Sequence, residues 1–284
     1  YPALLALSMV SLGFGAIRNP EIGGSDLVRV GFAVLAYVPN WFIIEDSSAW
    51  FGGLSHTWSL GVEMQFYLGW SLLVMLVLRK ADGGRGTLER VALVLAAGAF
   101  VWRIVLGQWG ADWTRIYAGT DTRMDSIFWG AWAAAYRVNR VAEQQKLPRW
   151  LGRRTWVRGI EIGFLVALVG ITFFVPAEMN PWSVSSFGLT GLGGAVVILT
   201  LVASPHSLLN KWCSPRALVW VGTISYSLYL WHLPAAKLLG VDAAFGGWGR
   251  ELLALLLSVG LAVLSYYGVE ARFRRRRSAA PTSG

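Results

Sequence analysis

A carboxylate stands among hydroxyls and aromatic rings in the stretch "LSHTWSLGVEMQFYLGW", residues 54–70. Ser59, Glu63 and Tyr67 are four residues apart, so a helix would place all three on one face. A carboxylate flanked by hydroxyls can accept a proton from a hydroxyl nucleophile or orient it. The spacing therefore indicates proton transfer at a hydroxyl group as one chemistry open to this helix.

An imidazole has a similar setting in "VGTISYSLYLWHLP", residues 221–234. Ser225, Tyr229 and His232 follow one another at i, i+4 and i+7 and share one helix face. Imidazole is the commonest general acid or base in proteins, so this face can relay a proton. The structural alternative is that His232 only donates to a backbone carbonyl between helices.

A third polar stretch, "TDTRMDS", precedes another apolar run. In one interpretation Asp125 holds Arg123 in place. In the other, Thr122 stands three residues before Asp125 as in a capping box, and both side chains cap helix donors. Arg103, near the end of the preceding apolar run, is expected to snorkel to the lipid headgroups.

The apolar composition determines which elements must position these residues. The chain has 284 residues, of which 55% are hydrophobic and 14% charged, and its mean hydropathy is +0.50. A soluble domain carries about 25% charged residues, and only helices or closed barrels satisfy backbone polar groups in lipid. The sequence therefore predicts an all-α, polytopic transmembrane bundle with about eight spans, at 1–16, 57–79, 88–107, 124–139, 159–175, 183–203, 217–239 and 250–268.

A further apolar stretch, residues 27–45, is interrupted by "AYVPNWF". Pro39 and Asn40 fall in its middle, and an internal proline removes a helix hydrogen bond. A re-entrant or interfacial segment is therefore expected there. Residues 1–277 are predicted to form one transmembrane domain, and the tail 278–284 is expected to be disordered.

The distribution of basic residues predicts the topology. Lysine and arginine concentrate in the connectors 79–90 and 137–158, beside Lys211 and Arg216, and in the closing "ARFRRRRS". The alternate connectors "IEDSSAWFGGLSH", "VPAEMNPW" and "GVDAAFGGW" contain none. By the positive-inside rule the basic segments and the C-terminus lie in the cytoplasm. This placement accounts for the net charge of +9 without a nucleic-acid partner.

This topology brings ionisable residues of four helices to a similar depth, toward their outer ends. They are Glu63, Arg103, Asp125 with its neighbour Arg123, and His232. Charges inside a membrane cost several kcal/mol unless they are paired or hydrated, and they indicate function by default.

Three segments resemble the acyltransferase 3 family. "HTWSLGVEMQFYL", "TDTRMDSIFWGAWAA" and "VGTISYSLYLWHLP" occur in the family's order, and "YYGVEARFRR" is similar to its final span. Members are integral membrane enzymes that acylate sugars of cell-envelope polysaccharides and other glycoconjugates. The resemblance implies an O-acyltransferase of the bacterial inner membrane that moves an acyl group, expected to be acetyl, from acyl-CoA to a glycan hydroxyl.

The resemblance also implies roles for individual residues. Glu63 is expected to orient or polarise the base or the acceptor. Arg123 is expected to offset charge on the thioester oxygen, with Asp125 holding it. His232, together with Tyr229, is expected to line the acceptor path or to relay a proton.

Further contacts with substrate are expected from Trp58, Ser59, Tyr67, Ser225 and Tyr229. No metal or bound cofactor is expected, because acyl-CoA is a co-substrate. The basic inner connectors suit its phosphates, although the positive-inside rule explains them equally well. The partners implied are the bilayer, acyl-CoA and a glycan acceptor.

Two features depart from the family pattern. Met64 stands where the family has a second acidic residue. Family members begin with a span that carries an Arg and a His, and "YPA" at Tyr1 is similar to the entry of their third span. The chain is therefore expected to lack the first one or two spans, including the usual general base, and to be inactive alone.

A polytopic transporter or flippase is the alternative from another functional class. Glu63, Arg123 and His232 would then form a proton relay or a substrate gate. No inverted repeat is visible in the sequence, which argues against this alternative.

Cys213 is the only cysteine in the sequence, so an internal disulfide framework and a zinc site with several cysteine ligands are excluded. The single cysteine also allows the topology to be tested by cysteine labelling. We expect the loops near 46–56, 108–122, 177–182 and 241–249 to face outward and the loop 140–158 to face the cytoplasm. In a Cys213→Ser background an impermeant thiol reagent should label Ala244→Cys, not Gly152→Cys, in intact cells. The opposite labelling pattern would overturn this topology.

Overall fold

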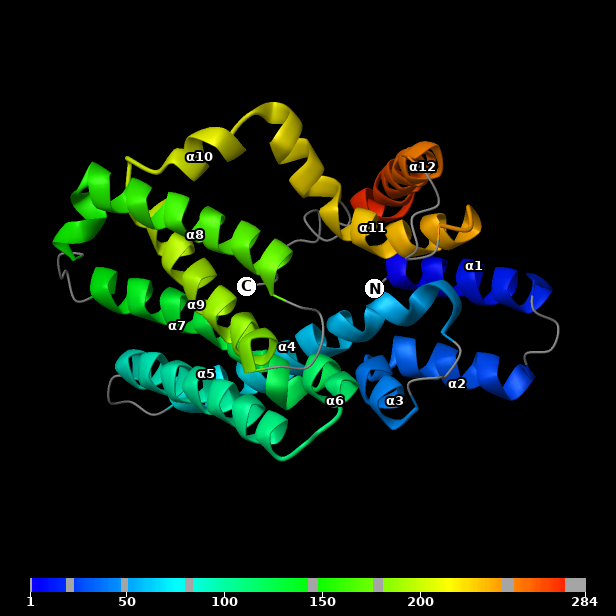
Figure 1. Ribbon diagram of the computed structural model, residues 1–284, viewed down its shortest axis with the longest axis horizontal. Helices are drawn as coiled ribbons and strands as arrows, with labels where there is room; N and C mark the ends of the chain where they lie inside the picture. The colour runs from blue at the N-terminus through cyan, green and yellow to red at the C-terminus, as the bar shows by residue number, and fades with distance from the viewer. Residues whose placement is uncertain are drawn as a thin grey trace, which may run out of the picture. The chain divides into compact units, whose positions relative to one another are not determined.

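The computed structural model describes residues 2–18, 23–46, 51–79, 84–142, 148–175, 181–241 and 248–273. Within these ranges every regular element is a helix (Figure 1), which confirms the predicted all-α class. The tail 278–284, expected to be disordered, lies outside the described residues. So do parts of the expected outer loops 46–56, 177–182 and 241–249.

Each of the eight expected spans coincides with one long helix. These helices are α1 (Pro2–Arg18), α4 (Trp58–Leu78), α5 (Gly84–Gln108), α7 (Thr120–Ala142), α8 (Arg154–Phe174), α9 (Pro181–Ala203), α11 (Arg216–Leu238) and α12 (Trp248–Ser265). Within the described residues, five helical stretches are long and apolar enough to cross a membrane, and they overlap α4, α5, α8, α9 and α12. The count of about eight spans stays a prediction.

Short elements connect the long helices. They are η1 (Gly52–Thr57), α6 (Trp113–Ala118), η2 (Arg149–Gly152), α10 (Leu208–Cys213) and the π-helical turn η3 (Tyr266–Glu270), which continues α12.

Residues 27–45 fall in two short helices, α2 (Gly24–Leu35) and α3 (Pro39–Glu45). Between them Tyr37 has a φ of 58°, in the left-handed region that turns the chain. Pro39 opens α3, where its missing N–H is not needed. At a rise of about 1.5 Å per residue neither helix approaches the roughly 30 Å of a bilayer core. This break agrees with the expected non-spanning segment.

The chain divides into two compact units, Tyr1–Gly61 with Pro215–Gly284, and Val62–Ser214. In the first unit α11 packs on α12, and α1 packs on α2, α11 and η1. Leu4, Leu54 and Leu230 are fully buried in its core. The core thus joins the N-terminal helices to η1 and α11, which positions the residues just before α4.

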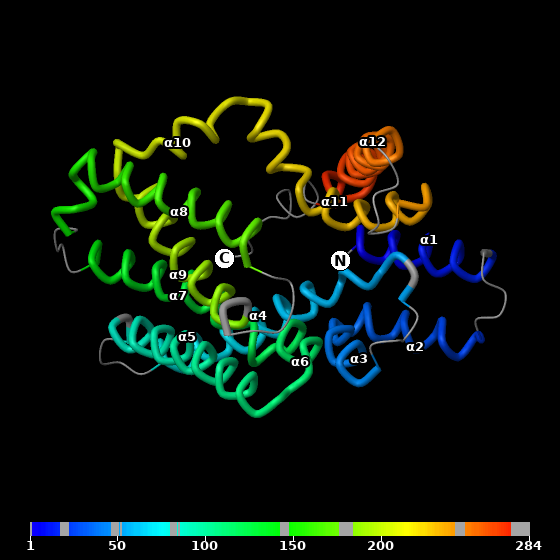
Figure 2. The backbone as a smooth tube through the Cα atoms, viewed as in Figure 1, coloured from blue at the N-terminus to red at the C-terminus, as the bar shows by residue number. Residues whose placement is uncertain are grey.

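In the second unit α5 lies along α7, and α9 packs against both α7 and α8 (Figure 2). Glycines of α9 permit this close approach, as is common between membrane helices. A Cβ atom at Gly191 would lie 2.7 Å from the Cα of Ser126 on α7, and one at Gly193 would lie 2.7 Å from the Phe164 ring on α8.

A buried carboxylate fixes the short helix α10 in the second unit. Glu161 on α8 is 1% exposed. Its Oε1 accepts from the Thr200 hydroxyl of α9 at 3.1 Å, and its Oε2 accepts from the backbone N–H groups of Leu208 at 2.8 Å and Leu209 at 3.4 Å. One side chain therefore ties α8, α9 and α10 together.

Glu161→Gln should loosen α10, because its amide nitrogen replaces one acceptor oxygen with a donor that faces other donors. An unsatisfied buried group costs about 1–3 kcal/mol. Thermal unfolding of the purified protein, with hydrogen exchange across residues 208–213, measures the loss. Glu251→Gln, at the partly exposed start of α12, is the control. Equal effects of the two substitutions would contradict the anchoring role of Glu161.

Candidate functional site

Two imidazoles and a phenol meet in the first unit. The His56 ring of η1 lies with its centroid 5.2 Å from the Tyr229 ring and 5.0 Å from the His232 ring, edge to face in both cases. Pro234 has no N–H, so the carbonyl of Leu230 lacks its usual helical donor, and the His56 ring lies beside this carbonyl. We call His56, Ser59, Tyr229 and His232 the histidine–tyrosine cluster.

A chain of hydroxyls holds this cluster together. The Tyr229 hydroxyl donates to the backbone carbonyl of His56, which can only accept. The Ser59 hydroxyl lies 2.6 Å from the Tyr229 oxygen. Since the single phenolic proton is already donated, Ser59 must be the donor in this second bond. The start of α4 is thereby joined to α11.

The His232 ring is set by a bond within its own helix, not between helices. Its Nδ1 lies 2.6 Å from the carbonyl oxygen of Tyr229. A carbonyl cannot donate, so Nδ1 carries the hydrogen and the neutral ring keeps its lone pair on Nε2. The side chain is exposed. This arrangement presents a proton acceptor of defined orientation.

The second unit contains a fully buried ion pair. Arg103 on α5 donates from Nη1 to Oδ1 of Asp125 at 2.9 Å and from Nη2 to Oδ2 at 2.7 Å, and both side chains are 0% exposed. Nη1 also donates to the carbonyl of Thr122 at 2.8 Å. This fork geometry is the strongest form of an arginine–carboxylate contact. The expectation that Arg103 snorkels to the headgroups is therefore wrong.

Both interpretations of the "TDTRMDS" stretch need correction. Both carboxylate oxygens of Asp125 accept from Arg103, so Asp125 acts on Arg123 through its charge and does not hold it by hydrogen bonds as expected. The capping-box alternative also fails, because α7 begins at Thr120 and the Thr122 hydroxyl donates to the carbonyls of Ile116 and Gly119. The sequence placed Asp125 at a helix start, whereas it lies in the second turn.

Arg123 is held by aromatic rings. Its guanidinium carbon lies 4.2 Å from the centroid of the Phe187 ring and 5.2 Å from that of Tyr117. Cation–π contacts of this kind orient a guanidinium while its charge is retained. The expected role of Arg123 opposite a thioester oxygen stays a prediction.

A second ion pair stands at the start of α7. Arg115 donates to both oxygens of Asp121, at 2.8 and 2.6 Å, and the Trp102 indole donates to the same carboxylate at 2.7 Å. Asp121 precedes the expected span 124–139. Burial favours its neutral form, but the hydrogen bonds from Arg115 and Trp102 outweigh burial and lower the pKa of Asp121.

The four remaining expected site residues are fully or partly exposed. Glu63 and Tyr67 share one face of α4, as their spacing predicts, and both side chains are exposed. Trp58 is the partly exposed first residue of α4. Ser225 is exposed, and its hydroxyl donates to the carbonyl of Gly222 at 2.8 Å. Their roles in binding or catalysis stay predictions.

Sequence reasoning missed two participants. The spacing patterns did not single out His56, and the signal available was its position two residues before Trp58 in "HTWSL". Phe187 gave no signal, because an aromatic residue in an apolar run is ordinary. Among the described residues no group of three or more His, Cys, Asp or Glu side chains could hold a metal ion.

Comparison with known proteins identifies the family. The family described as acyltransferase domain, acyltransferase 3, matches residues 1–267. The O-acetyltransferase OatA of Staphylococcus aureus is 28% identical, over 97% of this chain and 46% of its own length. The peptidoglycan O-acetyltransferase OatA of Listeria monocytogenes is also 28% identical, over 96% of this chain and 44% of its own length.

The chain belongs to the acyltransferase 3 family, because the family match covers most of its length. The match and the apolar helices together define a multi-pass membrane protein. The chain spans about half the length of the curated relatives it matches. No solved structure matches it.

The Arg103–Asp125 pair predicts a specific pattern of stability. Asp125→Asn or Arg103→Met should each cost about 3–5 kcal/mol, because a single substitution leaves a buried charge without its partner. Combining Arg103→Met with Asp125→Leu should recover most of that loss. Thermal unfolding of the unmodified protein, Arg103→Met, Asp125→Leu and their combination completes the double-mutant cycle, and Asp125→Asn is measured beside them.

The partly exposed pair of Arg115 and Asp121 provides the control. Arg115→Met should cost about 1 kcal/mol or less, as expected for an ion pair that water reaches. If Asp125→Asn costs only about 1 kcal/mol, as for loss of a helix cap, the account of the buried pair is wrong.

Proposed function

We propose that the protein is a membrane O-acyltransferase that transfers an acyl group, most simply acetyl, to a hydroxyl of a cell-envelope glycan. The family match over residues 1–267 carries this proposal. The names of the relatives, O-acetyltransferase and peptidoglycan O-acetyltransferase, favour acetyl as the acyl group and peptidoglycan as the acceptor.

The proposed donor is acyl-CoA from the cytoplasm. The basic connectors and the arginine-rich C-terminal segment would lie on the cytoplasmic side of the bacterial inner membrane, by the positive-inside rule. Their charge would attract the phosphates of CoA. The acceptor would meet the acyl group near the outer ends of the helices, where the sequence concentrates its ionisable residues.

The histidine–tyrosine cluster supports the proton transfer that the reaction requires. The acceptor O–H loses its proton, its oxygen forms a bond to the acyl carbon, the C–S bond breaks, and the thiolate takes up a proton. In the proposed mechanism Nε2 of His232 accepts or relays the proton, and Ser59 with Tyr229 maintains the geometry. Glu63 orients the base or the acceptor.

Acceptor-dependent release of CoA tests the proposal. The complete protein, reconstituted in vesicles with acetyl-CoA, should release CoA only when a glycan acceptor is present, with acetyl ester formed on the acceptor. Glu63→Gln should lower this rate about 100-fold or more, as expected for a residue that assists proton transfer or orients a reactant. Membrane insertion of the variant should be unchanged.

Glu45→Gln is the matched control, because Glu45 is an exposed carboxylate of α3 that pairs with Arg29 at 3.3 Å. Its rate should stay near that of the unmodified protein. Near-normal turnover in Glu63→Gln would remove Glu63 from the mechanism. Uptake of the substrate without an acceptor, in place of CoA release, would favour a transporter and contradict the proposal.

A further inference from the structure

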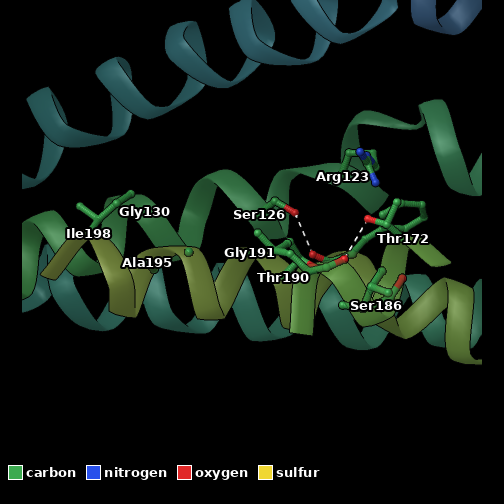
Figure 3. A pocket seen from close by; sticks show the side chains of 13 residues that line it. Arg123, Ser126, Gly130, Thr172, Ser186, Thr190, Gly191, Ala195 and Ile198 are labelled. Atoms are coloured by element: carbon green, nitrogen blue, oxygen red, sulfur yellow. Dashed lines mark hydrogen bonds between the residues drawn. The ribbon is translucent and has the colours of Figure 1, made fainter. Parts of the chain in front are cut away.

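A long cavity of about 460 Å³ runs between α7, α8 and α9 in the second unit (Figure 3). Thirteen residues line it. We call this cavity the α7–α9 slot. Pockets of about 300–1,000 Å³ are typical of small-molecule sites.

The lining of the slot changes from polar to apolar along α9. Ser186 and Thr190 line it near the start of the helix, whereas Gly194, Ala195 and Ile198 line it further along. The distance from residue 186 to residue 198 is about 18 Å at 1.5 Å per residue. The slot is therefore long enough for a chain-like ligand and has one polar end.

The lining on α7 repeats this gradient, whereas on α8 Thr172 is polar and Leu168 and Ile171 are apolar. On α7, Arg123 and Ser126 lie near the helix start and Gly130 lies about one turn deeper. Figure 3 shows Thr172 of α8 at the same end of the slot as Arg123, and Gly130 toward the other end. Among the described residues of the lining, Arg123 alone is charged, and it lies at the polar end, where its guanidinium rests on the Phe187 ring.

The slot reaches the outer surface of the helices. Thr172 is exposed, and Ile198, at the apolar end, is 50% exposed. Thr172 belongs to α8 and Ile198 to α9, and both helices are long and apolar enough to cross a membrane. The surface around the slot therefore faces hydrocarbon, and a lipid chain can enter it from the side.

We propose that the α7–α9 slot binds a phospholipid of the bilayer, with its anionic phosphate at Arg123 and one acyl chain along α9. The charge of Arg123 complements a phosphate, with which a guanidinium forms strong hydrogen bonds. The hydroxyls of Ser186 and Thr172 accompany it at the polar end. Headgroup and chain thus match the two ends of the slot. The proposal goes beyond acyl transfer and does not depend on it.

Gly130 offers a substitution that blocks the slot without disturbing the fold. A Cβ atom added there would meet no atom within 4 Å, so a leucine side chain would extend into the cavity. Gly98 on α5 also has no atom within 4 Å of its Cβ position and does not line the slot. Since both Gly→Leu changes favour helix equally, Gly98→Leu is the matched control.

Photo-crosslinking in vesicles of phosphatidylcholine tests the proposal. A trace of phosphatidylglycerol or of phosphatidylcholine would carry a diazirine in one acyl chain, and mass spectrometry would map the labelled peptides. In the unmodified protein phosphatidylglycerol should label residues 190–198 several-fold more than the zwitterionic lipid does. Arg123→Gln should reduce this excess about tenfold, and Arg123→Lys should retain part of it.

Gly130→Leu should lower labelling of residues 190–198 by both lipids about tenfold, because even one methylene changes binding in an apolar pocket by about that factor. Gly98→Leu should label as the unmodified protein does. Equal labelling by the two lipids in the unmodified protein would overturn the proposal, and that measurement needs no variant. Undiminished labelling in Gly130→Leu would overturn it as well. The labelling does not depend on acyl transfer, so it tests lipid binding even if the protein transfers no acyl group.

Discussion

The buried pair of Arg103 and Asp125 is the interaction on which the second unit depends. Two charges that are removed from water cost several kcal/mol each, and only close, well-directed contacts compensate for this cost. Both oxygens of Asp125 accept from Arg103, and the remaining Nη1 contact holds the Thr122 carbonyl. The pair therefore fixes α5 against the first turns of α7. The positions of the residues further along α7 depend on this contact.

The same interaction explains why α9 carries a glycine opposite the pair. A Cβ atom at Gly188 would lie 2.6 Å from both Nη2 of Arg103 and Oδ2 of Asp125, and would clash with the Phe100 ring. The absence of a side chain at Gly188 lets α9 cover the charges. Phe187, which directly precedes Gly188, stacks on Arg123. The second unit thus holds a fixed positive charge, whereas the first unit holds the histidine–tyrosine cluster.

The sequence predicted the helices well and their polar contacts poorly, for different physical reasons. Apolar length and the position of Pro39 are local properties, and both the long helices and the break between α2 and α3 follow from them. Partners across helices are tertiary properties. Asp125 stands two residues from Arg123 in the chain, yet it pairs with Arg103 on another helix. His56 reaches Tyr229 across 173 residues, so spacing along one helix could not reveal it.

One buried ion pair holds α5, α7 and α9 together, and Gly188→Ala tests this with a single methyl group. Hydrogen exchange followed by mass spectrometry should show faster exchange in all three helices at once, because the methyl group displaces both partners of the pair. Gly170→Ala on α8, where a Cβ atom meets nothing within 4 Å, should leave exchange unchanged. Faster exchange confined to α9, or no change in Gly188→Ala, would contradict the claim.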